Sequence, residues 1–196
     1  MVDATASYDI KALQAENDRL RSQVRALTIR AERAEELAEH DALTKVLNRR
    51  GLVSFMSRTI AYHRRRRVLT GLIYLDLDAF KAINDELGHA AGDEALKAVA
   101  RYLQSNVREF DAVGRIGGDE FGVVLLNVDA EQAKAKAASL MAGLAKEPFE
   151  YQGRQISLHG SIGVSTLDEH KGPEEWLAAA DAAMWVHKRA GRSSKT

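Results

Sequence analysis

The apolar residues between positions 8 and 39 form a narrow repeat with a period of seven residues. This segment contains no glycine and no proline, so we expect one uninterrupted helix. Position a of the heptad is held by Ile10, Asn17, Val24 and Ala31. Position d is held by Leu13, Leu20, Leu27 and Ala34. Four successive heptads of this kind predict a coiled coil. The alternative is one amphipathic helix packed on its own domain.

The residues around this seam favour a parallel pair of helices. β-branched residues at a with leucine at d favour two parallel strands, and a single asparagine at a, here Asn17, fixes their register. In a parallel dimer, Glu16 would face Arg21 of the second helix, which is an attractive contact. The same arrangement would bring Arg30 to Glu35. The sequence therefore predicts that residues 1–39 are a dimerisation helix and that the partner is a second copy of the chain.

Beyond residue 40 the pattern changes to alternating helices and strands. The expected helices are 48–67, 80–87, 93–107, 130–146 and 174–190. The expected strands are 68–76, 112–116, 120–126, 149–151 and 155–167. The continuous apolar run 68–76 predicts a strand buried on both faces. The pair Gly117-Gly118 predicts a two-residue hairpin turn, in which the glycines allow positive φ and let a ligand approach the backbone closely. This mixed order predicts that residues 40–196 form one α/β (α+β) domain with a largely antiparallel sheet.

Composition narrows the function classes. The 196 residues include 28 basic and 28 acidic side chains, and this balance gives no indication of nucleic-acid affinity. The absence of cysteine excludes disulfides, cysteine-ligated metals and thiol catalysis. The best apolar stretch, 68–75, is far shorter than the roughly 20 residues that a membrane helix needs. We therefore expect no membrane span and a cytoplasmic protein.

Acidic side chains stand where elements end. Asp76 and Asp78 follow the apolar strand, and Asp119-Glu120 follows the glycine pair. Carboxylates at strand ends can hold Mg²⁺ together with phosphate oxygens. If the two strands are neighbours, Asp76 and Asp119 can share a cation. Taken alone, an acidic strand end is more often a solvated turn.

Two further residues can recognise a nucleotide base. A carboxylate and an amide, here Asp93 and Asn84, can bond the edge of guanine. Lys81 lies one helical turn after Asp78 and can reach a phosphate. Taken alone, an Asn or Asp on a helix is usually a cap or a surface residue.

Together, these residues form two blocks, DLDAFKAIND at 76–85 and RIGGDEF at 115–121, with Gly92-Asp93 between them. This combination closely resembles the GGDEF family of diguanylate cyclases. The resemblance covers about residues 40 to 192. It implies a domain related to nucleotidyl-cyclase and polymerase palm domains, with a five-stranded sheet flanked by helices. It also implies a reaction in which two GTP condense to cyclic di-GMP and two pyrophosphates.

The resemblance also implies roles for individual residues. Asp76 and Asp119 match ligands of two Mg²⁺ ions, with Mn²⁺ as a substitute, and the carbonyl of Leu77 assists them. Asp119 also matches the proposed base for the 3′-hydroxyl, and Glu120 is the second acid of the signature.

Substrate and product contacts are implied in the same way. Asn84 and Asp93 match the guanine-reading positions, and Lys81 matches a lysine that contacts phosphate and stabilises the transition state. Near the C-terminus, Lys188 and Arg192 match residues that contact the terminal phosphates. Arg108 and Asp111 form an Arg-x-x-Asp pair, and five residues separate Asp111 from Gly117, the family's spacing for a site at which cyclic di-GMP inhibits its own synthesis.

Other functions are compatible with these residues. One is a domain that binds cyclic di-GMP or GTP without turnover, although such members usually lose signature acids and none is lost here. Another is an interaction protein whose coiled coil recruits partners. The chain departs from the family pattern at Lys45, Leu47 and Ser193, which usually are Gly, Pro and Asn. Trp176 and Trp185 are both expected in the core.

Overall fold

The computed structural model describes residues 3–66, 68–167 and 172–193. Within these ranges, the side chains of residues 3–11, 31–37, 66, 187 and 190–193 lie outside the description. The chain divides into two compact units, Met1–Ala38 and Glu39–Thr196, and each is treated separately below. No described helix is long and apolar enough to cross a membrane.

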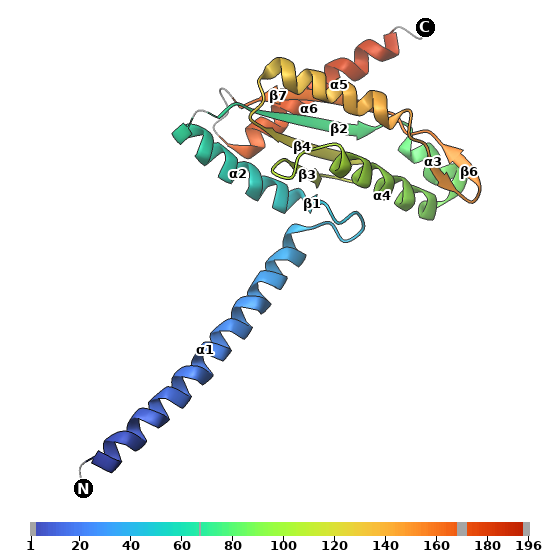
Figure 1. The fold of residues 1–196 in the computed structure, drawn as a ribbon. Helices are drawn as coiled ribbons and strands as arrows, with labels where there is room; N and C mark the ends of the chain where they lie inside the picture. Colours follow the sequence, from blue (N-terminus) through green and yellow to red (C-terminus); the bar gives the residue numbers. More distant parts are fainter. Residues whose placement is uncertain (1–2, 67, 168–171, 194–196) are drawn as a thin grey trace. The chain divides into compact units, whose positions relative to one another are not determined.

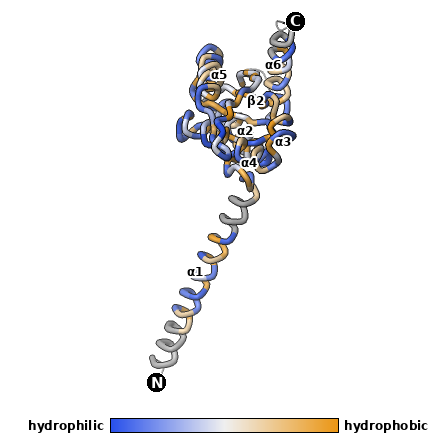
Figure 2. The backbone as a smooth tube through the Cα atoms, turned by 90° about the vertical axis from the view of Figure 1, so that its right-hand side faces the viewer, coloured by the Kyte–Doolittle hydropathy of each residue, from blue (hydrophilic) through white to orange (hydrophobic). Residues whose placement is uncertain are grey.

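The first unit is a single helix, α1 (Asp3–Glu39). Its 37 residues correspond to about 55 Å at 1.5 Å per residue. The four leucine and valine side chains of the heptad seam that are described are between 49% and 70% exposed; they are Leu13, Leu20, Val24 and Leu27. Figure 2 shows these apolar positions interspersed with polar ones along α1. The helix therefore carries an apolar seam that its own unit leaves uncovered.

The second unit is built on a five-stranded sheet of order β1-β3-β4-β2-β7 (Figure 1). Its strands are β1 (Leu47–Asn48), β2 (Thr70–Leu77), β3 (Ala112–Arg115), β4 (Glu120–Leu126) and β7 (Gly160–Thr166). Only the β1–β3 pair among these strands is parallel, so the predicted five-stranded, mostly antiparallel sheet is confirmed. A separate two-stranded sheet consists of β5 (Phe149–Tyr151) and β6 (Arg154–Ile156).

The two faces of the main sheet are covered by α2 (Arg49–Arg66), α4 (His89–Ser105), α5 (Ala130–Leu144) and α6 (Pro173–Ser193). The short helix α3 (Phe80–Leu87) packs against α4. Alternate residues of β2 point to opposite faces, as the pleat of a strand requires. Ile73 and Leu75 pack with α4 and α5, whereas Leu72 and Tyr74 pack with α2 and α6. The fully buried Trp176 of α6 belongs to the second core, as predicted.

Several expected elements differ from the structure. The predicted strand 155–167 is divided between β6 and β7, which belong to different sheets. β1 was not predicted, because two residues are too few to show a strand pattern. The predicted helix 93–107 begins earlier, at His89. Trp185 was expected in the core, but its side chain is 50% exposed. Lys45, where the resemblance expects glycine, adopts the left-handed conformation that favours glycine, with φ 63°.

The turn between β3 and β4 is one residue longer than predicted. Arg115 pairs with Phe121, and the N–H of Ile116 donates to the Glu120 carbonyl at 2.8 Å. These two pairs leave three residues, 117–119, in the loop that joins the strands. The prediction of a two-residue turn was wrong.

The glycines of this turn allow other groups to lie close to the backbone. Neither Gly117 nor Gly118 has a positive φ, so the turn does not use the backbone freedom that glycine allows. A Cβ on Gly117 would overlap the Glu120 carboxylate, so a larger residue would displace this acid. No atom lies within 4 Å of the position that a Cβ on Gly118 would occupy, so this side of the turn is open.

Close packing between α6 and β7 predicts a strong effect of a small substitution. A Cβ on Gly163 would overlap the backbone of Ala180 and Met184. We expect Gly163→Ala to lower the free energy of unfolding by about 1–3 kcal/mol, because backbone cannot move aside cheaply. Gly172→Ala is the matched control, since no atom lies within 4 Å of its Cβ position. Urea denaturation should show a change below about 0.5 kcal/mol for the control.

Candidate active site

Strand register brings the signature carboxylates together. Asp76, near the end of β2, pairs directly with Glu120, the first residue of β4. The N–H of Leu77 donates to the carbonyl of Asp119 at 3.2 Å, which extends the ladder into the turn. Asp76, Asp119 and Glu120 thus lie at one edge of the sheet, as the sequence predicted for neighbouring strands.

The charges at this edge are crowded. Burial raises the pKa of Asp119, and the nearby negative charge of Asp76 raises it further. The charges of Lys188 and Arg115 oppose this effect in part. Lys188 of α6 forms an ion pair with Asp76, and both side chains are about four-fifths buried. A cation supplied by the protein therefore partly neutralises the carboxylates.

These residues fit a divalent cation chemically. Mg²⁺ and Mn²⁺ prefer oxygen ligands, which Asp76, Asp119 and the backbone of Leu77 provide. The repulsion that raises the pKa of Asp119 is the kind of strain that a bound cation relieves. Within the described residues no group of three or more His, Asp or Glu side chains is gathered closely enough to hold a metal alone. Further oxygen ligands would have to come from substrate or water.

Arg115 braces the signature turn, a role that sequence patterns did not reveal. Its guanidinium donates to the carbonyl of Gly118 at 2.7 and 3.1 Å and forms a salt bridge with Asp41 at 3.2 Å. Asp41 in turn accepts hydrogen bonds from the backbone and hydroxyl of Thr44. Burial alone would raise the pKa of Asp41, but these hydrogen bonds and the charge of Arg115 lower it. The turn is thereby attached to the segment that precedes β1.

The two predicted base-reading residues lie on adjacent helices. Asn84 is on α3 and Asp93 is on α4, and the contact between the two helices places them close together. A Cβ on Gly92 would overlap the amide of Asn84, so this amide packs directly beside the backbone that leads into Asp93. Lys81 is exposed in the first turn of α3, after Ala79, which has a left-handed φ of 56°.

Of the predicted inhibitory pair, Arg108 is accessible to a ligand, whereas the Asp111 carboxylate is already hydrogen-bonded to the backbone. Both carboxylate oxygens of Asp111 accept backbone hydrogen bonds, from Arg108 at 3.0 Å and from Leu126 at 2.9 Å. The Arg108 side chain is exposed, and its guanidinium lies 5.7 Å from the ring centre of Phe110. Asp111 therefore shapes the loop, and Arg108 presents its charge beside an aromatic face.

The C-terminal phosphate-binding pair is described only in part. Lys188 contacts Asp76, which sequence reasoning did not predict. Its ammonium also lies 5.9 Å from the ring centre of Trp185. The side chain of Arg192 lies outside the described residues.

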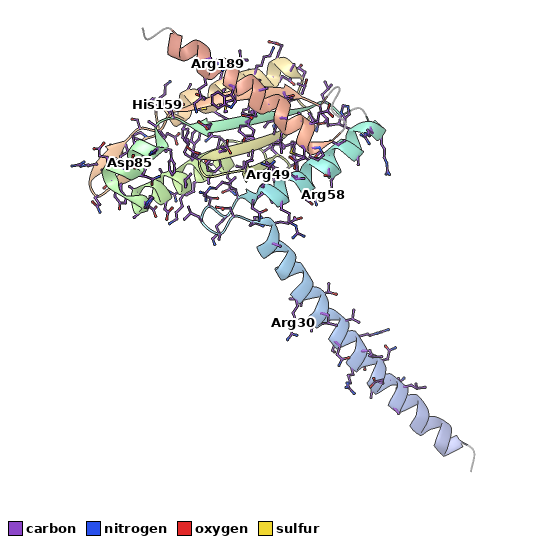
Figure 3. The ribbon with its side chains drawn as sticks, turned by 180° about the vertical axis from the view of Figure 1, so that it is seen from behind. Arg30, Arg49, Arg58, Asp85, His159 and Arg189 are labelled. Carbon is purple, nitrogen blue, oxygen red and sulfur yellow. The ribbon has the colours of Figure 1, made fainter. Side chains whose placement is uncertain are left out.

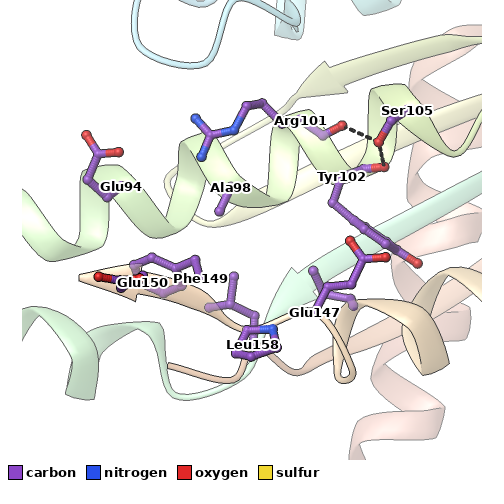
Figure 4. A pocket seen from close by; sticks show the side chains of 11 residues that line it. Glu94, Ala98, Arg101, Tyr102, Ser105, Glu147, Phe149, Glu150 and Leu158 are labelled. Carbon is purple, nitrogen blue, oxygen red and sulfur yellow. Dashed lines mark hydrogen bonds between the residues drawn. The ribbon is translucent and has the colours of Figure 1, made fainter. Parts of the chain in front are cut away.

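Two cavities lie away from the signature turn. One, of about 450 Å³, is lined by α4 and residues 144–150, and it contains none of the predicted site residues (Figure 4). The other, of about 590 Å³, separates α3 from the β5–β6 hairpin and includes Asp78. Asp78 accepts a hydrogen bond from the Ser161 hydroxyl at 2.9 Å, so it supports β7 rather than facing Asp119.

Comparison with known proteins gives a consistent result. A family model described as diguanylate cyclase, GGDEF domain, matches residues 38–194. Diguanylate cyclase DosC of Escherichia coli is 36% identical over 172 residues, which cover 85% of this chain and 37% of that protein. Diguanylate cyclase DgcP of Pseudomonas aeruginosa is 32% identical, with coverage of 93% and 27%. The chain thus spans little more than a third of DosC and about a quarter of DgcP.

Solved structures agree with the fold. A sensory box/GGDEF family protein from Caulobacter crescentus has a TM-score of 0.73 and 37% identity, and the match covers 78% of this chain and 99% of that one. The coiled coil and GGDEF domain of DgcB from Caulobacter crescentus, solved with c-di-GMP, has a TM-score of 0.81 at 22% identity, with coverage of 91% and 95%. At that identity the second likeness concerns the fold.

The opposite pKa shifts of Asp119 and Asp41 predict opposite effects of neutralising each carboxyl. The raised pKa of Asp119 means that the fold favours the neutral form of this carboxyl over the charged form. The stability that this preference provides is present at low pH and is lost as pH rises through the raised pKa. Without divalent cations, Asp119→Asn should be more stable than the wild type at pH 7, and the difference should shrink as pH falls. The lowered pKa of Asp41 gives the reverse sign at pH 7.

Asp41→Asn is therefore the paired control. It should lose about 1–3 kcal/mol at pH 7, because a charged hydrogen-bond acceptor is removed. That deficit should shrink as pH falls through the lowered pKa. Urea denaturation in a chelator, followed from pH 7 to below the ordinary aspartate pKa of 3.8, measures both effects. Equal signs for the two variants at pH 7 would contradict this account of the site.

Proposed function

The chain belongs to the GGDEF family of diguanylate cyclases, and we propose on this premise that it condenses two GTP into cyclic di-GMP. The observation that carries the proposal is the strand register that sets Asp76 opposite Glu120, with Asp119 in the adjoining turn. No signature acid is replaced, which favours turnover over silent binding. Since GTP is a cytoplasmic metabolite, the proposal also assigns this unit to the cytoplasm.

Each residue has a distinct task in this proposal. In each of two equivalent steps, a 3′-hydroxyl attacks the α-phosphate of the other GTP, a new P–O bond forms, and pyrophosphate leaves. Asp119 accepts the hydroxyl proton, because a carboxylate placed beside the hydroxyl can act as a general base. Asp76 and Asp119 would hold Mg²⁺, which would lower the pKa of the hydroxyl and offset the phosphate charge.

The remaining residues bind the substrate. Asn84 and Asp93 bond the guanine edge, and this pair favours GTP over ATP. Lys81, Lys188 and Arg192 contact the phosphates. The ion pair with Asp76 holds Lys188 beside the reacting groups before a nucleotide binds.

We further propose that α1 joins two chains in parallel. One site holds one GTP, so ring closure needs two sites facing each other. The exposed seam of Leu13, Leu20, Val24 and Leu27 is suited to a second copy of the helix. A tether of this kind raises the effective concentration of one catalytic unit near another toward the millimolar range. A different partner for the seam would instead indicate an interaction role.

The reaction itself is the first test. With GTP and Mg²⁺, or Mn²⁺, the purified chain should release cyclic di-GMP and pyrophosphate, identified by mass spectrometry. Asp119→Asn and Glu120→Gln should lower the rate at least 100-fold, because charge stabilisation in the transition state is lost. Both variants should retain the wild-type circular dichroism spectrum. Normal synthesis by either variant would refute the assignment of these acids.

The second test removes the helix. Deleting residues 1–38 should leave a folded unit that binds GTP but has little activity at low micromolar concentration, because two units rarely meet. Fusion to an unrelated parallel dimeric coiled coil in the same heptad phase should restore activity. Light scattering reports the mass of each form. A truncated chain that stays dimeric and fully active would show that α1 is not the dimerisation element.

The third test concerns feedback by the product. We propose that Arg108 binds cyclic di-GMP, because its exposed guanidinium can bond guanine or phosphate in two places. Arg108→Ala should relieve inhibition by added cyclic di-GMP without changing the initial rate. Asp111→Ala is not an equivalent variant, because the loss of two backbone hydrogen bonds should lower stability by about 1–3 kcal/mol. Unslowed wild-type progress curves in added product would refute the proposal.

A further inference from the structure

Tyr74 lies in the middle of β2, two residues before Asp76 and on the same face of the sheet. Its side chain is 6% exposed and belongs to the core between the sheet and helices α2 and α6. Its neighbours on both adjoining strands are glycines, Gly122 of β4 and Gly163 of β7. Among these three paired residues, Tyr74 is therefore the only one that is not glycine.

The two glycines leave a slot for the tyrosine between the helices. A Cβ on Gly122 would meet the side chain of Leu52 of α2. A Cβ on Gly163 would overlap the backbone of α6. Both helices thus pack closely against the sheet on either side of Tyr74. In an interior packed at this density, a ring has little freedom to adopt another position.

The hydroxyl group of Tyr74 lies near the signature acid. Glu120 is on the same face of the sheet, diagonally across the β2–β4 pair. Burial, and then the charge of Glu120, raise the pKa of Tyr74, so the hydroxyl keeps a proton that it can donate to the Glu120 carboxylate. Two more charges act on it: Arg49 at the start of α2, labelled in Figure 3, and Asp181 of α6.

Glu120 is thereby confined on two sides. One of its carboxylate oxygens occupies the space that a Cβ on Gly117 would fill, and Tyr74 lies diagonally opposite it on the same face of the sheet. A carboxylate at a reaction centre is effective only when its orientation is fixed before the substrate binds. The sheet interior, rather than the exposed turn, supplies this orientation.

We propose that Tyr74 is a positioning residue whose hydroxyl holds the Glu120 carboxylate in its working orientation beside Asp76 and Asp119. The proposal rests on the cyclase function proposed above. It assigns to a buried strand residue a task in the reaction that the signature motif itself does not reveal.

The test compares two substitutions that each remove one buried hydroxyl. Tyr102→Phe is the matched control: Tyr102 is 8% exposed, and its hydroxyl donates to the Leu140 carbonyl at 2.9 Å in the opposite core. Both variants should lower the melting temperature by similar amounts. Tyr74→Phe alone should lower kcat about tenfold, which corresponds to about 1.4 kcal/mol. KM for GTP should stay within about twofold, because Glu120 is not a base-reading residue.

A double-mutant cycle makes the test specific for Glu120. Glu120→Asp shortens the acid beyond reach of the hydroxyl, so adding Tyr74→Phe to it should change kcat by less than about twofold. The proposal is overturned if Tyr74→Phe keeps the wild-type kcat, if Tyr102→Phe loses as much, or if the two effects multiply. A wild-type chain that makes no cyclic di-GMP would overturn the cyclase function as well, and this outcome is distinct from the other three.

Discussion

The antiparallel register between β2 and β4 is the constraint on which the catalytic unit depends. Seven consecutive residue pairs, from Thr70–Leu126 to Asp76–Glu120, fix this register between two helix layers. A slip of one residue would exchange the two faces of β2, burying Asp76 against α4 and α5. The apolar residues of both faces oppose such a slip, so hydrophobic packing far from the turn determines where the acids lie.

Sequence patterns predicted most of the fold because its elements have strong local signals. The apolar run of β2 and the periods of α2, α3, α5 and α6 each identify an element within a few residues. The errors arose where tertiary contacts decide. β1 exists through its parallel pairing with β3. The strand predicted at 155–167 is broken because its first part pairs with β5 and its second with β2. No local pattern specifies either choice.

The same distinction applies to the candidate site. The acids and the base-reading pair stand in motifs and could be named from the sequence, although their roles are still proposals. The supporting contacts could not be predicted: Tyr74 and Lys188 approach the acids across strand or helix boundaries, and Arg115 reaches Asp41 over 74 positions. Their types are ordinary for a strand or a helix surface. Only the three-dimensional arrangement shows that the site is supported from the sheet interior and from α6.

The β3–β4 hairpin has, at each end, a loop to which we assign a function. Glu120 opens β4 beside the signature turn, and Leu126 closes it with a hydrogen bond to Asp111 of the Arg108 loop. Seven residues at roughly 3.3 Å each separate the two loops by about 23 Å. An insertion or deletion within β4 would therefore disturb both loops at once, reversing the face of every residue beyond it. We therefore expect variation in chain length to fall outside this hairpin, and a peptide tag or reporter inserted here to disrupt both loops together.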